Sequence, residues 1–317
     1  MITAKHLEQS EVRDQSIVKF SNDLFFKYML SREHPVSSAL LIHLINLITK
    51  INCCQAIVLN PAIDADHVSG KGIVLDVRIQ DDKGNIFNIE MQMYGSSASQ
   101  MKRMQYYVAA MITDQLNQGE HYYRLRKVYQ CVFINLNNNN DTLIEKYEFK
   151  NQYHQPIASS LSSSYFIYIK QIDKILETKK VEELSDLERL CYLFKNNDYN
   201  GIIKEEDEDI IRQVITMYEK FKKDDEMWEL GRLRESALNL EESHKMEYRD
   251  IGHAEGMKEG LLKGLINSCN LIIKNLYQVE SISWLETLSK NQLEHIQILA
   301  FKIKDFNQLK KEIEKFE

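Results

Sequence analysis

Two neighbouring segments in which every second residue is apolar constrain the fold of this chain most. Residues 73–79 read IVLDVRI and residues 87–93 read FNIEMQM. Because alternate side chains of a strand point to opposite faces, each segment has one apolar face as a β-strand. Between them, Asp82-Lys83-Gly84 supplies a three-residue loop in which Gly84 can adopt the left-handed conformation. The pattern predicts an antiparallel hairpin.

The register of this hairpin follows from the same pattern. A slip by one residue would place apolar side chains opposite polar ones, so only registers of one parity are allowed. The predicted pairs are Ile79 with Phe87, Val77 with Ile89 and Leu75 with Met91. On the other face, Asp76 falls opposite Glu90 with Cβ atoms about 5 Å apart, and Gln92 lies one pleat further along.

Two carboxylates in these positions repel one another unless a positive charge lies between them. One interpretation is a solvated face, because antiparallel sheets often expose one side to water. The other is a divalent cation, because oxygen ligands from adjacent strands suit Mg²⁺, which takes one or two carboxylates together with waters and substrate phosphate. The residue pattern leaves both interpretations open.

Helices and short β-rich runs alternate through the first half of the chain. Apolar residues recur at helical spacing in SNDLFFKYMLS and HPVSSALLIHLINLI, where Ser21 or Asn22 can cap and Pro35 suits a first turn. The β-rich runs begin at Gln55, and a helix of about five turns over residues 97–119 interrupts them. This order predicts an α/β core with helices on at least one face of the sheet.

The second half is almost entirely helical, which divides the chain near residue 175. We expect a core domain over residues 1–175 and a helical region over residues 176–317. Within that region Gly252, Gly256, Gly260 and Gly264 recur at a spacing of four. Each glycine costs a helix interior up to about 1 kcal/mol. Because the helix keeps four of them, we expect the stripe to allow close approach of a second helix, and the chain to form a homo-oligomer, a dimer. The alternative is a solvated helix weakened by glycine.

Charge is unevenly distributed along the chain. The formal net charge is −7, yet residues 1–150 contain 16 basic and 16 acidic residues, so the excess acid lies in the second half. A phosphate-binding surface is therefore compatible with the first half, around Lys102, Arg103 and His121–Lys127. The chain contains no run of about 18 apolar residues and does not begin like a secretory signal. We expect a cytoplasmic protein that does not bind membranes.

Four separated motifs occur in a definite order. They are Asp23-x-x-Phe26-Lys27, then LDV, then IEMQ about a dozen residues later, and finally a helix with Arg103 and the pair Tyr106-Tyr107. From about Asn22 to Leu136 the arrangement resembles the recombination-promoting nuclease and transposase family of the PD-(D/E)XK nuclease superfamily. The resemblance implies a restriction-endonuclease-like α/β core, with a mixed β-sheet flanked by helices. It also implies DNA cleavage that depends on Mg²⁺, with Mn²⁺ able to substitute.

The resemblance assigns roles to the residues of the hairpin. By position Asp76 is the metal-binding aspartate, Glu90 is the second acid, and Gln92 takes the place of the superfamily's lysine. Asp23 is a further candidate metal ligand, unless it only favours the dipole of the first helix. A glutamine amide can orient a water molecule but cannot deprotonate it. The alternative is therefore a catalytically inactive module on the same fold that binds nucleic acid or protein.

Candidate DNA contacts lie on the helix after the hairpin. Arg103 and Tyr107 stand one turn apart, so both can reach over the same surface. Lys102 and Arg103 can neutralise phosphates, and Tyr106 or Tyr107 can stack or donate a hydrogen bond there. A snorkelling arginine beside core tyrosines is the alternative.

Overall fold

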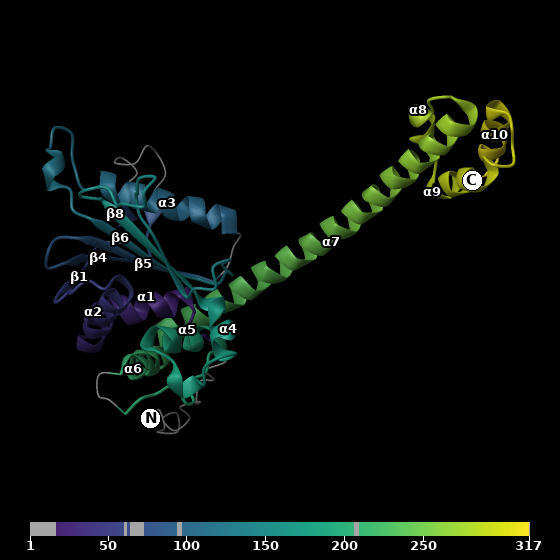
Figure 1. Cartoon of the computed structure of the whole chain (residues 1–317). Coiled ribbons are helices and arrows are strands. Elements are labelled where there is room, and N and C mark those ends of the chain that lie inside the picture. The colour runs from purple at the N-terminus through teal and green to yellow at the C-terminus, as the bar shows by residue number, and fades with distance from the viewer. Residues whose placement is uncertain (1–16, 60–61, 64–72, 94–96, 206–208, 317) are drawn as a thin grey trace, which may run out of the picture. The chain divides into compact units, whose positions relative to one another are not determined.

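A computed structural model describes residues 17–59, 62–63, 73–93, 97–205 and 209–316 (Figure 1). The chain divides into two units, Met1–Asn239 and Leu240–Glu317. Each unit has an apolar core of its own. Across the described part of the chain, no helix has both the length and the apolar character needed to cross a membrane.

A six-stranded sheet forms the centre of the first unit, in the order β1-β4-β5-β6-β8-β7. β6 runs parallel to its neighbours β5 and β8, whereas the pairs β1–β4, β4–β5 and β7–β8 are antiparallel. The strands are β1 (Ala56–Leu59), β4 (Val77–Asp81), β5 (Ile86–Gln92), β6 (Val128–Ile134), β7 (Ile144–Tyr147) and β8 (Ser162–Tyr168). A separate antiparallel pair consists of β2 (Ala62–Ile63) and β3 (Ile73–Val74). The predicted mixed sheet is confirmed.

Helices cover both faces of this sheet, with α3 on one face and α1, α2, α5 and α6 on the other (Figure 1). Their bounds, with that of the short α4, are α1 (Asp23–Ser31), α2 (Pro35–Thr49), α3 (Ser97–Thr113), α4 (Ile172–Leu176), α5 (Asp186–Asn196) and α6 (Ile210–Lys223). Phe26 of α1 and Phe194 of α5 meet Phe133 of β6 with ring centroids 5.9 and 5.4 Å apart. These aromatic contacts join the helical layer to the sheet. α1 also contacts β4 and β5.

Local signals account for the start of the first two helices. The Asn22 side chain accepts hydrogen bonds from the backbone N–H groups of Leu24 and Phe25 at 3.1 and 3.2 Å, so Asn22 is the cap of α1. Pro35 is the first residue of α2, where a backbone N–H is not needed. Both signals can be recognised in the sequence.

The hairpin of β4 and β5 has the predicted loop and parity. Val77 pairs with Ile89 and Ile79 with Phe87, and Gly84 in the loop has a φ of +80°. The ladder stops at Val77, however, because the chain bends at Asp76. The predicted pair of Leu75 with Met91 is therefore wrong. Leu75 packs instead into a buried cluster with residues of α3, β5 and β6, namely Ala110, Met111, Ile86 and Val128.

The boundary expected near residue 175 does not coincide with the division into units, which falls between Asn239 and Leu240. The chain beyond Leu176 is helical, as predicted, but α5 and α6 bury their apolar faces in the core of the first unit. Tyr218 of α6, for example, meets Phe25 of α1 with ring centroids 5.0 Å apart. These helices therefore complete the sheet domain.

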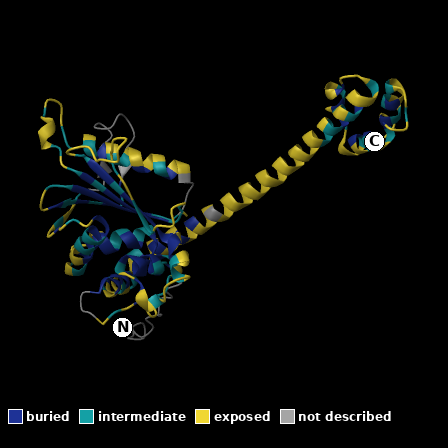
Figure 2. Cartoon of the chain, viewed as in Figure 1, coloured by how far each residue is buried: buried dark blue, intermediate teal, exposed yellow. Residues whose placement is uncertain are grey.

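The second unit begins within the long helix α7 (Asp225–Tyr277). Its core gathers Cys269 and Ile273 of α7 with residues of α8 (Ile282–Leu285), α9 (Lys290–Leu299) and α10 (Phe306–Ile313). Residues 243–264 of α7 are exposed to solvent (Figure 2). A Cβ atom at any of the four striped glycines, Gly252, Gly256, Gly260 and Gly264, would meet nothing within 4 Å. Within the described residues of this chain, no second helix makes the close approach that the stripe permits.

Candidate active site

Asp76 lies in the bend between β3 and β4, where its side chain and backbone are both tied to β5. Its Oδ2 accepts a hydrogen bond from the backbone N–H of Met91 at 3.0 Å. Its own backbone N–H donates to Oε1 of Glu90 at 3.1 Å. These two hydrogen bonds replace the ladder that the hairpin would otherwise continue. They fix the two carboxyl groups beside each other without direct side-chain pairing.

Glu90 is almost fully buried in the middle of the sheet, with 2% of its surface exposed. Burial raises the pKa of Glu90 to about 8, and the negative charge of Asp76 acts in the same direction. Hydrogen bonds from the Asp76 backbone and the Gln92 side chain lower this pKa, but they do not outweigh burial. The Glu90 carboxyl group therefore keeps its proton near neutral pH unless a cation takes the proton's place.

Gln92 connects Glu90 to α3. Its Nε2 donates to Oε2 of Glu90 at 2.9 Å, and its Oε1 accepts a hydrogen bond from Nη2 of Arg103. The Arg103 guanidinium lies 5.9 Å from the ring centre of Tyr107. Burial raises the pKa of Tyr107, and the Glu90 charge contributes to the rise. Arg103, Tyr107 and Gln92 thus adjoin the two acids.

The other predicted site residues lie on α3 and at the start of α1. Lys102 and Tyr106 are exposed on α3, and Tyr106 keeps 38% of its surface accessible. Asp23, at the start of α1, pairs with the guanidinium of Arg234 in α7, with Oδ2 2.7 Å from Nη2. Among the described residues, no three His, Cys, Asp or Glu side chains are grouped to hold a metal. Asp23 therefore does not join Asp76 and Glu90 in this structure.

Lys27 of α1 is the residue at this site that sequence reasoning missed. Its Nζ lies 3.1 Å from Oδ1 of Asp76, so the two form an ion pair. Lys27 follows Asp23 by one helical turn and belongs to the Asp23-x-x-Phe26-Lys27 motif. That motif was the available signal, but nothing local shows that α1 packs against the bend at Asp76.

The polar face of the hairpin is not the solvated surface that one interpretation expected. Asn88 and Glu90 of β5 and Gln130 of β6 expose 0, 2 and 1% of their surfaces. Gln130 donates to the backbone carbonyl oxygen of Met104 in α3 at 3.1 Å, which shows that α3 covers this face. Arg78 of β4 is likewise shielded and pairs with Asp114 at 2.5 Å. The interpretation as a merely wet face is therefore wrong.

Asp76 and Glu90 offer a donor set that fits a hard divalent cation. Mg²⁺ accepts one or two carboxylates and completes its shell with waters and substrate phosphate. Burial, with the negative charge of Asp76 as a second cause, raises the pKa of Glu90, and a bound cation would favour the ionised carboxylate. Asp76 and Glu90 would hold such an ion. When bound, it would lower the pKa of a water and offset charge on a phosphodiester.

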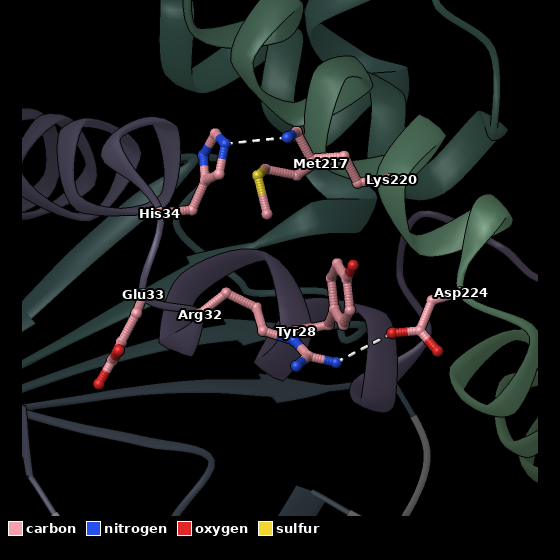
Figure 3. Close-up of a pocket in the computed structure, with 7 residues that line it drawn as sticks. All are labelled: Tyr28, Arg32, Glu33, His34, Met217, Lys220 and Asp224. Atoms are coloured by element: carbon pink, nitrogen blue, oxygen red, sulfur yellow. Dashed lines mark hydrogen bonds and ion pairs between the residues drawn. The ribbon is translucent and has the colours of Figure 1, made fainter.

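A cavity of about 380 Å³ is lined by residues of α1, α6 and the segments that follow them, and it does not include these acids. Figure 3 shows its lining: Tyr28, Arg32, Glu33, His34, Met217, Lys220 and Asp224. Arg32 pairs with Asp224 at 3.1 Å and covers the ring of Tyr28 at 4.4 Å. Arg32 and Asp224 thus already balance each other's charge, and the carboxylate site remains the better candidate for chemistry.

Comparison with known proteins supplies one match. A family model described as PD-(D/E)XK nuclease family transposase matches residues 20–246. The match covers all six strands of the main sheet and every residue of the site described above. No curated protein and no solved structure matches this chain.

Proposed function

Because this chain belongs to the PD-(D/E)XK nuclease family transposases, we propose that it is an endonuclease that hydrolyses DNA phosphodiester bonds with Mg²⁺. Membership of this family supports a role as a nuclease or in transposition. The observation that supports the finer proposal is the interlocked pair of Asp76 and Glu90, buried together with a raised Glu90 pKa. Mn²⁺ can replace Mg²⁺, because both accept carboxylate and water ligands.

In this proposal Asp76 and Glu90 are the catalytic acids that hold the metal. Gln92 orients the attacking water through its amide, which keeps one N–H and one oxygen lone pair beyond the bonds described. The bound metal would supply the acidity of that water. The sheet and α3 exclude bulk solvent from Glu90, which strengthens electrostatic interactions at the site.

DNA would approach along the exposed side of α3. Arg103 is exposed and reaches Gln92, so its guanidinium lies where a phosphate near the acids can be contacted. Lys102 and Tyr106 are exposed on neighbouring turns of the same helix. We propose that Lys102 contacts the DNA backbone and that Tyr106 and Tyr107 support this contact. The arginine contact would be strongly salt-dependent.

A non-catalytic DNA-binding module on the same fold is the second candidate. It is favoured by Gln92, whose amide already bonds Glu90 on one side and Arg103 on the other. Glutamine also cannot supply the positive charge or the proton transfer that a lysine provides. Retention of DNA binding without cleavage under all metal conditions would decide for this candidate.

We also propose that the chain forms a homodimer through α7. The four glycines lie on a solvated stretch of the helix, where a Cβ atom would be accommodated without contact. No close helix contact among the described residues therefore offsets the loss of helix propensity at these glycines. Two exposed apolar residues, Met257 and Leu261, directly follow Gly256 and Gly260. Pairing with a second copy would bury these side chains.

The test of the nuclease proposal is cleavage of supercoiled plasmid with Mg²⁺, Mn²⁺ or EDTA. We expect nicking or linearisation only with metal, and loss of both in Asp76→Ala and Glu90→Ala. Asp23→Ala is the matched control, because Asp23 pairs with Arg234 rather than with these acids. Cleavage that survives in Asp76→Ala or Glu90→Ala would reject the assigned site.

A further inference from the structure

The two carboxylate oxygens of Asp76 have different partners. Oδ2 accepts the backbone N–H of Met91 at 3.0 Å, which belongs to the fixed frame of β5. Oδ1 lies 3.1 Å from the ammonium group of Lys27. One oxygen is thus held by the main chain, and the other faces a positive charge. A cation that binds Asp76 through Oδ1 must share or take the place of Lys27.

The two sides of this ion pair are held in place differently. Asp76 is tied to the sheet through its side chain and its backbone, and 13% of its side chain is exposed. Lys27 reaches the site on a flexible four-carbon stem, and 36% of its side chain is exposed. The α1 backbone below it is anchored by Phe25, Phe26 and Met29, all fully buried. The ammonium group can therefore move away while the carboxylate stays in place.

We propose that Lys27 is a resident counter-ion that a divalent metal displaces from Asp76, and that the freed ammonium group then contacts a DNA phosphate. This inference rests on the proposed function, because it takes Asp76 as a metal ligand. While Lys27 occupies Oδ1, it balances the charge of Asp76 without metal. Once displaced, it adds a positive charge beside the cleavage site. Lys27 thereby couples metal binding to DNA binding, and linkage requires each to strengthen the other.

The first measurement is metal affinity without DNA. Calorimetric titration of Mn²⁺ into Lys27→Met should show binding about two- to fivefold tighter than in wild type, because a competing partly exposed ion pair is gone. Lys27→Gln should behave alike, and Lys27→Arg should keep the weaker binding. Lys19→Met is the matched control, because Lys19 is similarly exposed and pairs with Glu235 at 3.3 Å. Its metal affinity should equal that of wild type.

The second measurement is binding of a DNA duplex, followed by fluorescence anisotropy with Ca²⁺ or with EDTA. Lys27→Met should weaken binding more in Ca²⁺ than in EDTA, because the wild-type ammonium group is free only when metal occupies Asp76. In Ca²⁺ the slope of log affinity against log salt should shrink by about one. An equal loss in both conditions would remove the proposed coupling.

The outcomes separate this inference from the proposed function. If Asp76→Asn abolishes Mn²⁺ binding but Lys27→Met and Lys27→Gln bind no more tightly than wild type, Lys27 is not a competitor and the metal site stands. If wild type and Asp76→Asn bind Mn²⁺ equally, or neither binds, the metal site itself is refuted, and the role of Lys27 with it. Thermal melting of each variant verifies that the first unit remains folded.

Discussion

Glu90 accepts a hydrogen bond from the backbone N–H of Asp76 through Oε1 at 3.1 Å, so the second acid of the site binds the main chain of the first. This relationship explains how two neighbouring acids coexist in the hairpin. The Asp76 carboxylate turns to the N–H of Met91 and to Lys27, while Glu90 is buried and holds its proton more tightly. Repulsion between the two acids is relieved by the bend at Asp76, by Lys27 and by the raised pKa of Glu90. In the proposed function, a metal would take the place of the lysine and of the proton.

The raised pKa of Glu90 predicts that metal-free protein loses stability as the pH rises. Between the ordinary pKa of 4.5 and the folded value of about 8, the folded state retains a proton that the unfolded state has released. The free energy of unfolding therefore falls across this window, by an amount on the order of a few kcal/mol. Glu90→Gln should remove this contribution. Urea unfolding in EDTA at pH 5, 6.5 and 8.5 measures the difference, and parallel curves for the two proteins would contradict it.

Divalent cations should stabilise the first unit. At ten times the dissociation constant, Mg²⁺, Mn²⁺ or Ca²⁺ should add about 1.4 kcal/mol, which raises the melting temperature by a few degrees. Asp76→Asn can keep the hydrogen bond from Met91 but loses the charge, so its melting temperature should not respond. The proposed metal site at Asp76 would be rejected if none of the three ions changed the melting temperature of the wild type. It would also be rejected if Asp76→Asn responded to them as strongly as the wild type.

Substitutions at Gln92 should show whether its amide orients the attacking water or has only a structural role. Gln92→Leu removes the hydrogen bonds to Glu90 and Arg103, so cleavage should fall at least tenfold, about 1.4 kcal/mol of barrier, while the fold persists. Gln92→Lys places a positive charge beside Glu90 and should preserve or raise cleavage. Single-turnover cleavage rates provide the measurement. A fully active Leu variant would show that the amide has no part in the reaction.

Bulky residues at the glycine stripe should disrupt association. Gly256→Leu with Gly260→Leu raises helix propensity, and the open space around both positions means that the single chain accommodates the side chains. Close contact with a second helix would be obstructed, so sedimentation velocity should show smaller species than wild type. The corresponding double Ala variant is the control, because it raises propensity with little added bulk. Identical sedimentation of wild type and the Leu variant would reject the proposed dimer.

Local sequence was sufficient for several parts of this protein. The hairpin parity, the loop with Gly84 and the cap at Asn22 were predictable because each depends on residues close together in the chain. The α/β core followed from the order of helical and extended periodicities, and the mixed sheet followed from the family resemblance. The pair of Asp76 and Glu90 could likewise be singled out, because strand alternation places both on the polar face.

Tertiary structure decided how those residues are surrounded. Periodicity shows which face of an element is apolar, but it does not show which distant element covers the other face. The burial of Glu90 requires α3 to pack over the sheet, and the ion pair at Asp76 requires Lys27 to arrive from a helix about fifty residues earlier. Likewise, Asp23 forms an ion pair with Arg234, which lies more than two hundred residues away in the sequence. Contacts at such separations depend on how whole layers pack, so only the folded chain determines the charge environment of the site.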